Sequence, residues 1–339
     1  MPSIFGSLIR AINKKDNKLN ILCINNDEPF QYSLAKTGHN FYYLSIQQLR
    51  NWDQRIRPIP HNVYMLNGND LNIQLSIDLN FDIILCQNRI EQYSTLSQIS
   101  RQLSCPIIMA ENSLSYPGTN PFYLESLADQ KYNLTIFNFD FICKSWGFDQ
   151  QDIKVKIIPP GIDTDLFIDW SGKDNIPLTV ARRYREKNKS TGFELFTKIN
   201  NKIKIKCIGD SPGISLPTKD LSELVRLYQN CSMYINTSSW QSCPLALLEA
   251  MSTGCPVIST STTVIPEIIK NGNNGFISND ENEIIKEMKI IIENKILAKE
   301  IGIKARETIK NNFNENSFIS KWNDVFSNVV GKPCELIVG

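Results

Sequence analysis

Glu249 is the one acidic residue in a short apolar run that predicts a helix, and Gln241 stands eight positions earlier, before that helix begins. A carboxylate near a helix start can accept hydrogen bonds from the hydroxyls of a polyhydroxy ligand, while the free N–H groups of the helix N-terminus face an anion. The competing interpretation is an amphipathic helix with Glu249 on its solvent-exposed face.

Cationic side chains crowd a second stretch, just before a helix predicted near Phe193. Arginine grips a diphosphate through two parallel hydrogen bonds, so this loop suits such a group. The alternative is a solvated, charged loop without a ligand. The cations are Arg182, Arg183, Arg185, Lys187 and Lys189.

Local signals define the elements that would position the carboxylate. Pro244 suits the first position of a helix, where no intrahelical N–H partner is needed. Gly254 predicts the end of that helix, and residues 256–258 predict a short buried strand. Gly272 and Gly275 break the chain again.

Apolar runs that predict buried strands recur along the chain and alternate with stretches of helical periodicity. This alternation predicts parallel, doubly wound α/β sheets, in which ligands lie beyond the carboxyl ends of the strands. The runs lie at 19–24, 41–44, 62–66, 82–86, 106–110, 133–139, 177–181, 203–208 and 232–236.

Residues 237–276 resemble, as a whole, the donor-site signature of GT-B glycosyltransferases, specifically the large retaining family 4. That signature has an acidic residue, seven spacers, a second Glu in LEAM, and then GxPVIS, PEII and NGxNGF. Glu249 matches the second acid. The first acid is replaced by Gln241, whose amide still accepts and donates hydrogen bonds.

Two further stretches carry the resemblance. Residues 155–167, VKIIPPGIDTDLF, are similar to the strand and IPNGVDxxxF string at the end of the family's first domain. Arg182 and Lys187 match the spacing of the family's GRxxxxKG string, with Lys189 as the alternative to Lys187. Gly209 opens a turn similar to the family's GDGP.

Asp163 and Asp165 imitate the Asp-x-Asp metal motif of a different glycosyltransferase fold. The flanking PPGI and Phe167 instead assign them to the domain junction. We therefore predict no metal site and no cofactor beyond the substrate itself.

The resemblance implies a GT-B fold of two Rossmann-like domains facing across a cleft. Residues 1–168 would form the acceptor-side domain and residues 169–312 the nucleotide-sugar domain. Residues 313–339 would form a terminal helix that packs back on the first domain.

The resemblance also implies a retaining, metal-independent hexosyltransferase that uses a UDP- or GDP-sugar and an unidentified acceptor. Glu249 would hold the ribose hydroxyls, Gln241 the sugar hydroxyls, and the cations Arg182 and Lys187 the diphosphate. The remaining donor-side residues would be Lys189, Gly209, Ser242, Cys243 and Leu245.

Acceptor-side contacts are expected from Asn88 and Glu111, which follow predicted strands, with loop capping as the alternative. His39 precedes the second strand and is interpreted as structural.

Two other functions stay open. One is a non-catalytic relative that binds a nucleotide or a sugar, and the missing acid favours it. The other is a nucleotide-sugar epimerase of the same plan. A nicotinamide dehydrogenase is excluded because no Gly-x-Gly-x-x-Gly string follows any predicted strand.

Composition limits the other partners. The net charge of +1 gives no signal for nucleic acid, and the nine scattered cysteines fit a reducing cytoplasm. No apolar run reaches the ~20 residues of a membrane helix. Residues 1–15 are a short amphipathic stretch, for which weak contact with a membrane surface is the sharper hypothesis and a surface helix the plainer one.

Overall fold

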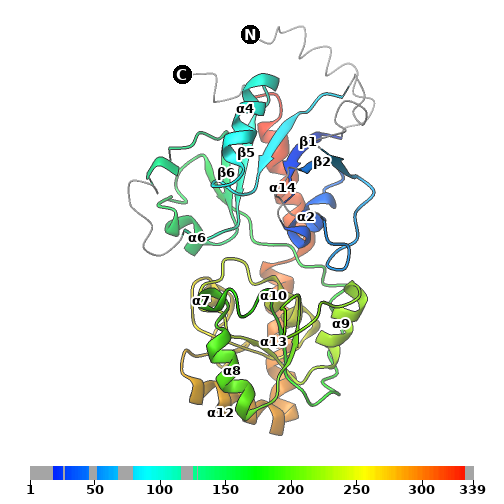
Figure 1. Ribbon diagram of the computed structural model, residues 1–339, viewed down its shortest axis with the longest axis vertical. Coiled ribbons are helices and arrows are strands. Elements are labelled where there is room, and N and C mark those ends of the chain that lie inside the picture. Colours follow the sequence, from blue (N-terminus) through cyan, green and yellow to red (C-terminus); the bar gives the residue numbers. More distant parts are fainter. Residues whose placement is uncertain are drawn as a thin grey trace. The chain divides into compact units, whose positions relative to one another are not determined.

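The computed structural model describes residues 18–25, 27–45, 52–67, 79–115, 125–127 and 129–332 (Figure 1). The hypothesis of membrane-surface contact through residues 1–15 therefore lies outside the described residues. The chain divides into two compact units. The first comprises Met1–Gln54, Pro58–Ile158 and Phe318–Gly339, and the second comprises Arg55–Arg57 and Pro159–Ser317.

The first unit contains one parallel sheet of seven strands in the order β3-β2-β1-β4-β5-β6-β7. Its strands lie where the buried apolar runs predict them, so the predicted parallel α/β sheet is confirmed. The bounds are β1 (Asn20–Ile24), β2 (Asn40–Ser45), β3 (Val63–Asn67), β4 (Ile83–Cys86), β5 (Ile107–Glu111), β6 (Leu134–Phe137) and β7 (Val155–Ile157).

In the described part of this unit four helices accompany the sheet, and the last comes from the far end of the sequence. They are α2 (Glu28–Ala35), α4 (Tyr93–Leu103), α6 (Asp140–Ser145) and α14 (Glu315–Val329). α14 lies beside α2 (Figure 1). Its Phe318 and Trp322 rings lie edge-on to Phe30 of α2, each at 6.0 Å between ring centroids. His39 accepts a hydrogen bond from the Leu19 amide at 3.2 Å, a structural role.

The second unit contains a parallel sheet of five strands in the order β12-β11-β10-β8-β9. Its short strands are tightly buried at β10 and β11, and the two-residue β12 is an element that the sequence did not predict. The bounds are β8 (Leu178–Val180), β9 (Lys206–Ile208), β10 (Tyr234–Asn236), β11 (Val257–Ser259) and β12 (Phe276–Ile277).

Side-chain hydrogen bonds cap the N-termini of three helices in the described part of the second unit, α9, α12 and α13. Asp220 accepts a hydrogen bond from the Glu223 amide, and Asp280 accepts two from the Asn282 and Glu283 amides. The bounds are α7 (Asn188–Thr191), α8 (Phe193–Lys202), α9 (Leu221–Asn230), α10 (Leu245–Thr253), α11 (Ile265–Ile268), α12 (Glu281–Glu293) and α13 (Lys295–Asn312).

The segment that follows Ile158 belongs to the second unit. Within that unit the Ile162 amide donates to the Phe313 carbonyl at 2.8 Å, and the Phe167 ring packs on Tyr228. The second unit ends at Ser317.

Two glycines fix where α10 lies. Gly254 ends this helix with φ +87°, a left-handed conformation that glycine adopts at little cost. A Cβ on Gly302 of α13 would lie 1.9 Å from the Gly254 carbonyl oxygen, so only glycine permits this approach of the two helices. The packing of α10 on α13 thus sets the position of the carboxylate that α10 carries (Figure 1).

Candidate functional site

Glu249 lies on the inner side of α10 and is 4% exposed. The helix begins after Pro244, whose carbonyl accepts from the Leu248 amide, and its other side chains are mostly buried as well. An exposed position for Glu249, the competing interpretation from sequence, is therefore wrong. A buried carboxylate has to be compensated by hydrogen bonds or by a cation, so its partners matter.

Two side chains compensate this carboxylate. Tyr228 of α9 donates its hydroxyl to Glu249 Oε2 at 3.1 Å, and Arg57 Nη2 forms a buried ion pair with Oε1. Burial, and after it the charge of Glu249, raises the pKa of Tyr228 well above its usual value. The phenol therefore stays protonated and acts as a permanent donor.

Arg57 and Tyr228 were not singled out from the sequence. Arg57 lies 192 positions from Glu249 and belongs to the short segment Arg55–Arg57 of the second unit. No local motif marks either residue, because a pairing over such a separation depends on the tertiary fold. The amphipathic pattern of α9 predicts a buried face that includes Tyr228 but gives no sign of its partner.

The loop before α10 carries Gln241, Ser242 and Cys243, which are half-buried, as is Leu245 in the first turn. Thr263 Oγ1 donates to the Gln241 carbonyl at 2.7 Å and so fixes the loop backbone. The side-chain Oε1 of Gln241 is enclosed and has no hydrogen-bond partner among the described residues. A buried amide oxygen of this kind is suited to a ligand hydroxyl.

The cationic loop follows β8 and leads into α7. Arg182, Lys187 and Lys189 are exposed. The Lys189 carbonyl accepts from Ser239 Oγ at 2.5 Å, and the Ser190 carbonyl accepts from the Ser239 amide at 2.9 Å. The backbone of the cationic loop is thereby joined to the loop that carries Gln241.

Glycines allow the neighbouring turns to approach this loop. Gly209 follows β9 with φ +119°, and a Cβ there would lie 2.1 Å from the Ala181 carbonyl oxygen. A Cβ on Gly192 would lie 1.8 Å from the Thr237 carbonyl oxygen. The turns after β8, β9 and β10 therefore gather at one edge of the sheet, the carboxyl edge at which α/β sheets bind ligands.

In the first unit the two predicted acceptor-side residues have local partners. Asn88 Oδ1 accepts from the amides of Ile90 and Glu91, both at 3.0 Å, which is the capping arrangement. Glu111 is fully buried; its Oε2 accepts from Arg89 Nε at 3.0 Å and its Oε1 from the Ser113 amide at 3.0 Å.

Among the residues that the structure describes, no group of three His, Cys, Asp or Glu side chains is arranged to hold a metal ion. Asp163 Oδ1 instead accepts from the Asp165 and Leu166 amides, at 3.1 Å and 3.0 Å, and so closes a turn. The described part of the chain also contains no helix with the length and apolarity that crossing a bilayer requires.

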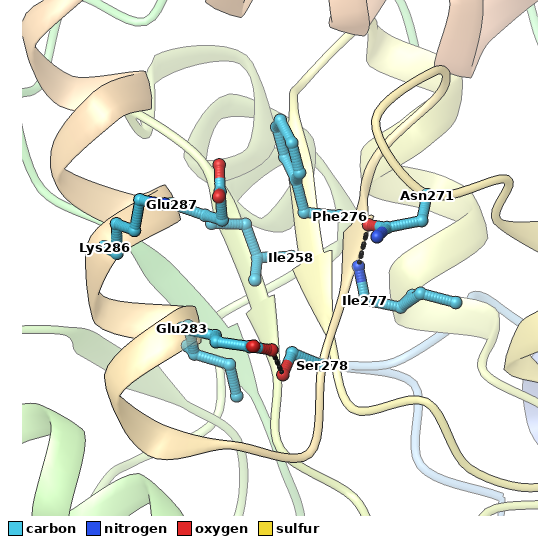
Figure 2. Close-up of a pocket in the computed structure, with 9 residues that line it drawn as sticks. Ile258, Asn271, Phe276, Ile277, Ser278, Glu283, Lys286 and Glu287 are labelled. Atoms are coloured by element: carbon cyan, nitrogen blue, oxygen red, sulfur yellow. Dashed lines mark hydrogen bonds between the residues drawn. The ribbon is translucent and has the colours of Figure 1, made fainter.

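A separate cavity of about 240 Å³ lies between β11, β12 and α12. Figure 2 shows the residues that line it. Ser278 Oγ donates to Glu283 Oε2 at 2.5 Å on one side, and Asn271 Oδ1 accepts from the Ile277 amide at 2.9 Å on another. None of the predicted donor-site residues lines this cavity. It is therefore distinct from the gathered turns at the carboxyl edge.

Comparison with known proteins connects these features to a family. Residues 213–308 match the family described as glycosyl transferases group 1, a region that contains Gln241 and Glu249. The poly(ribitol-phosphate) α-N-acetylglucosaminyltransferase of Staphylococcus aureus is 26% identical over 102 residues, which cover 29% of this chain and 21% of that protein. The chain thus spans about a fifth of the length of the curated relatives it matches.

Solved structures share the fold over most of the chain. Anabaena HepE, in complex with UDP and glucose, has a TM-score of 0.71 at 14% identity, covering 91% of this chain and 100% of that one. The sucrose-phosphate synthase of Thermosynechococcus elongatus has a TM-score of 0.71 at 13% identity, covering 92% and 99%. At these identities the likeness establishes the fold alone, which is GT-B.

Proposed function

Because this chain carries a group 1 glycosyl transferase region in a GT-B fold, we propose that it transfers a hexose from a nucleoside diphosphate sugar to an acceptor, with retention of configuration. The bond between the anomeric carbon and the diphosphate breaks, and a bond from that carbon to an acceptor oxygen forms. The observation that carries the proposal is the joining, at one sheet edge, of the cationic loop and the Gln241 loop, from which α10 leads to the buried acid Glu249.

Each part of this edge has a proposed task. Glu249 accepts the ribose hydroxyls, and Gln241 hydrogen-bonds the transferred sugar. Arg182 and Lys187, with Lys189 beside them, neutralise the diphosphate as it leaves, and Gly209 lets the backbone approach it. Stabilising such developing charge is commonly a large share of catalysis. We expect no metal to be needed because this loop supplies the neutralising cations.

The nucleotide proposed for the donor is UDP or GDP. HepE was solved with UDP and glucose and with UDP-glucose, which supports UDP as the first nucleotide to test. The proposed acceptor side is the first unit, at the carboxyl ends of β4 and β5 where Asn88 and Glu111 lie. Their observed hydrogen bonds favour the capping alternative for Asn88 and an internal ion pair for Glu111.

A second candidate function is binding without transfer, and the amide at position 241 favours it. One experiment distinguishes sugar transfer from binding without transfer. A thermal-shift screen with UDP, GDP, ADP and their sugars detects binding, since a ligand at 100 times its Kd stabilises the folded state by about 2.7 kcal/mol. Slow release of free nucleotide from the sugar that binds best then shows that the glycosidic bond is broken.

Transfer predicts both a raised Tm and nucleotide release that Glu249→Ala abolishes. A raised Tm with no nucleotide release over prolonged incubation would favour the binding protein. No shift with any of the nucleotides or sugars would contradict the proposed function.

A further inference from the structure

The buried ion pair at Glu249 leaves part of the carboxylate unused. An ionised carboxylate has about four lone-pair positions, and the hydrogen bonds from the described residues use one on each oxygen, with Arg57 at Oε1 and Tyr228 at Oε2. Within the described part of the chain, one position on each oxygen is therefore left. Two acceptor positions on the two oxygens of one carboxylate match the two neighbouring hydroxyls of a ribose.

Arg57 is itself held on several sides. Its Nη1 donates to the Ile56 carbonyl at 2.8 Å, and its guanidinium lies 5.9 Å from the ring centroid of Phe167. Arg57 also precedes Pro58, and a residue before proline is restricted to extended conformations. With 6% of its side chain exposed, the guanidinium is a fixed cation rather than a mobile surface charge.

The cluster is closed by aromatic contacts. The Phe167 ring packs edge-on against Tyr228, at 6.1 Å between centroids, and Tyr228 packs in the same way on Tyr234. Arg57, Phe167 and Tyr228 thus form a shell around Glu249 that permits few side-chain rotamers. A planar guanidinium sets the plane of its carboxylate partner, which a lysine ammonium does not do.

We propose that Arg57 is a positioning residue for the donor: it orients the Glu249 carboxylate so that the two remaining acceptor positions receive the ribose hydroxyls. The inference rests on the proposed function and adds a residue outside the matched region 213–308. Arg57 does not touch the nucleotide. It acts through Glu249, and its effect is therefore confined to the ribose.

Because Arg57 is expected to affect only the contact with the ribose, its loss can be told apart from a general loss of structure by comparing the affinities for two nucleotides. UDP and 2′-deoxy-UDP share the base and the diphosphate and differ in one ribose hydroxyl. A partly unfolded protein binds both probes more weakly by the same factor. A misoriented carboxylate weakens UDP alone, so the ratio of the two Kd values reports the orientation of Glu249.

The experiment measures this ratio by isothermal titration calorimetry in the full chain, with circular dichroism as the check of folding. We expect the wild type to prefer UDP by about tenfold, the value of one hydrogen bond to a charged group. Arg57→Met lowers the ratio to about one. Arg57→Lys, which keeps the buried charge and the fold, gives a ratio between the two.

The matched control is Arg226→Met, which removes an exposed arginine from α9, two residues before Tyr228. It is expected to keep the wild-type ratio. If Arg57→Met and Arg57→Lys both keep that ratio, the inference is overturned while the proposed function stands. Tighter UDP binding by Arg57→Met also overturns it, since Arg57 would then compete with the nucleotide. If the wild type binds neither UDP nor the GDP and ADP pairs, the proposed function fails and the inference with it.

Discussion

Each unit of the molecule contains a buried arginine–glutamate pair, and the two pairs differ in how completely they are enclosed. Arg89 and Glu111 of the first unit have fully buried side chains, whereas the Arg57 and Glu249 side chains are 6% and 5% exposed. In the first pair the guanidinium lies 4.7 Å from the centroid of the Trp146 ring, and Glu111 also accepts from Ser113. In the second pair the Tyr228 hydroxyl donates a further hydrogen bond to the carboxylate.

The difference shows that a buried charge pair does not by itself mark a binding site. Glu111 has Arg89 on one oxygen and the amide and hydroxyl of Ser113 on the other, so little of it is left for a ligand. Glu249 keeps an acceptor position on each oxygen and lies on the helix that follows the Gln241 loop. We therefore propose a stabilising role for the first pair and a ligand-binding role for the second.

The largest effect is expected from Glu249→Ala. Removal of the carboxylate deletes the proposed ribose contact and the ion pair between Glu249 and Arg57, so transfer falls at least about a thousandfold, or ~4 kcal/mol in the barrier. Donor-dependent nucleotide release measures this, with Arg226→Met as the control. Wild-type turnover in the folded variant would contradict a ligand-binding role for Glu249.

Arg89→Met tests whether the Arg89–Glu111 pair of the first unit stabilises the fold. It leaves Glu111 as a buried charge without its cationic partner Arg89, and breaking such a pair costs about 3–5 kcal/mol of unfolding free energy. Urea unfolding measures the loss, and Arg101→Met, at an exposed position of α4, is the matched control. The fraction that stays folded is expected to bind nucleotide like the wild type. A variant of unchanged stability would contradict the structural assignment of this pair.

Gln241→Ala tests whether this side chain binds the transferred sugar or the nucleotide. The side chain is assigned to the transferred sugar, so turnover is expected to fall about tenfold while the affinity for UDP stays unchanged. Titration calorimetry with UDP and with a UDP-sugar makes the comparison. An equal loss of affinity for both would assign Gln241 to the nucleotide instead.

The smallest effect is expected at Asn88, where capping predicts a loss of about 1 kcal/mol of stability in Asn88→Ala. Asp accepts the same two amide hydrogen bonds, so Asn88→Asp is expected to restore both stability and turnover. Reduced turnover in a fully stable Asn88→Asp variant would favour the acceptor-side hypothesis over capping.

Much of the fold follows from local sequence. Pro244 and Gly254 bracket α10, and the buried strands β1, β4 and β5 coincide with apolar runs. The exceptions are elements whose stability depends on tertiary contacts. The predicted strand at 203–208 is reduced to Lys206–Ile208, and the two residues of β12 become a strand only by pairing with β11.

The candidate site, like the fold, was predicted from the sequence only where local motifs mark it. The sequence predicted which residues lie around α10 and the cationic loop, since both fall in motifs of fixed spacing. It did not predict that Arg57 is the partner of Glu249, because that pair joins residues 192 positions apart. Hydrogen bonds over such separations follow from the arrangement of the whole unit and leave no periodic signal in the sequence.

The most direct test of the account is a crystal structure of the chain soaked with UDP-glucose or GDP-mannose. The account predicts one bound donor at the carboxyl edge of the five-stranded sheet. Its ribose hydroxyls would lie within hydrogen-bond distance of Glu249, and its diphosphate beside Arg182 and Lys187. A donor bound elsewhere, or one whose ribose does not reach Glu249, would contradict it.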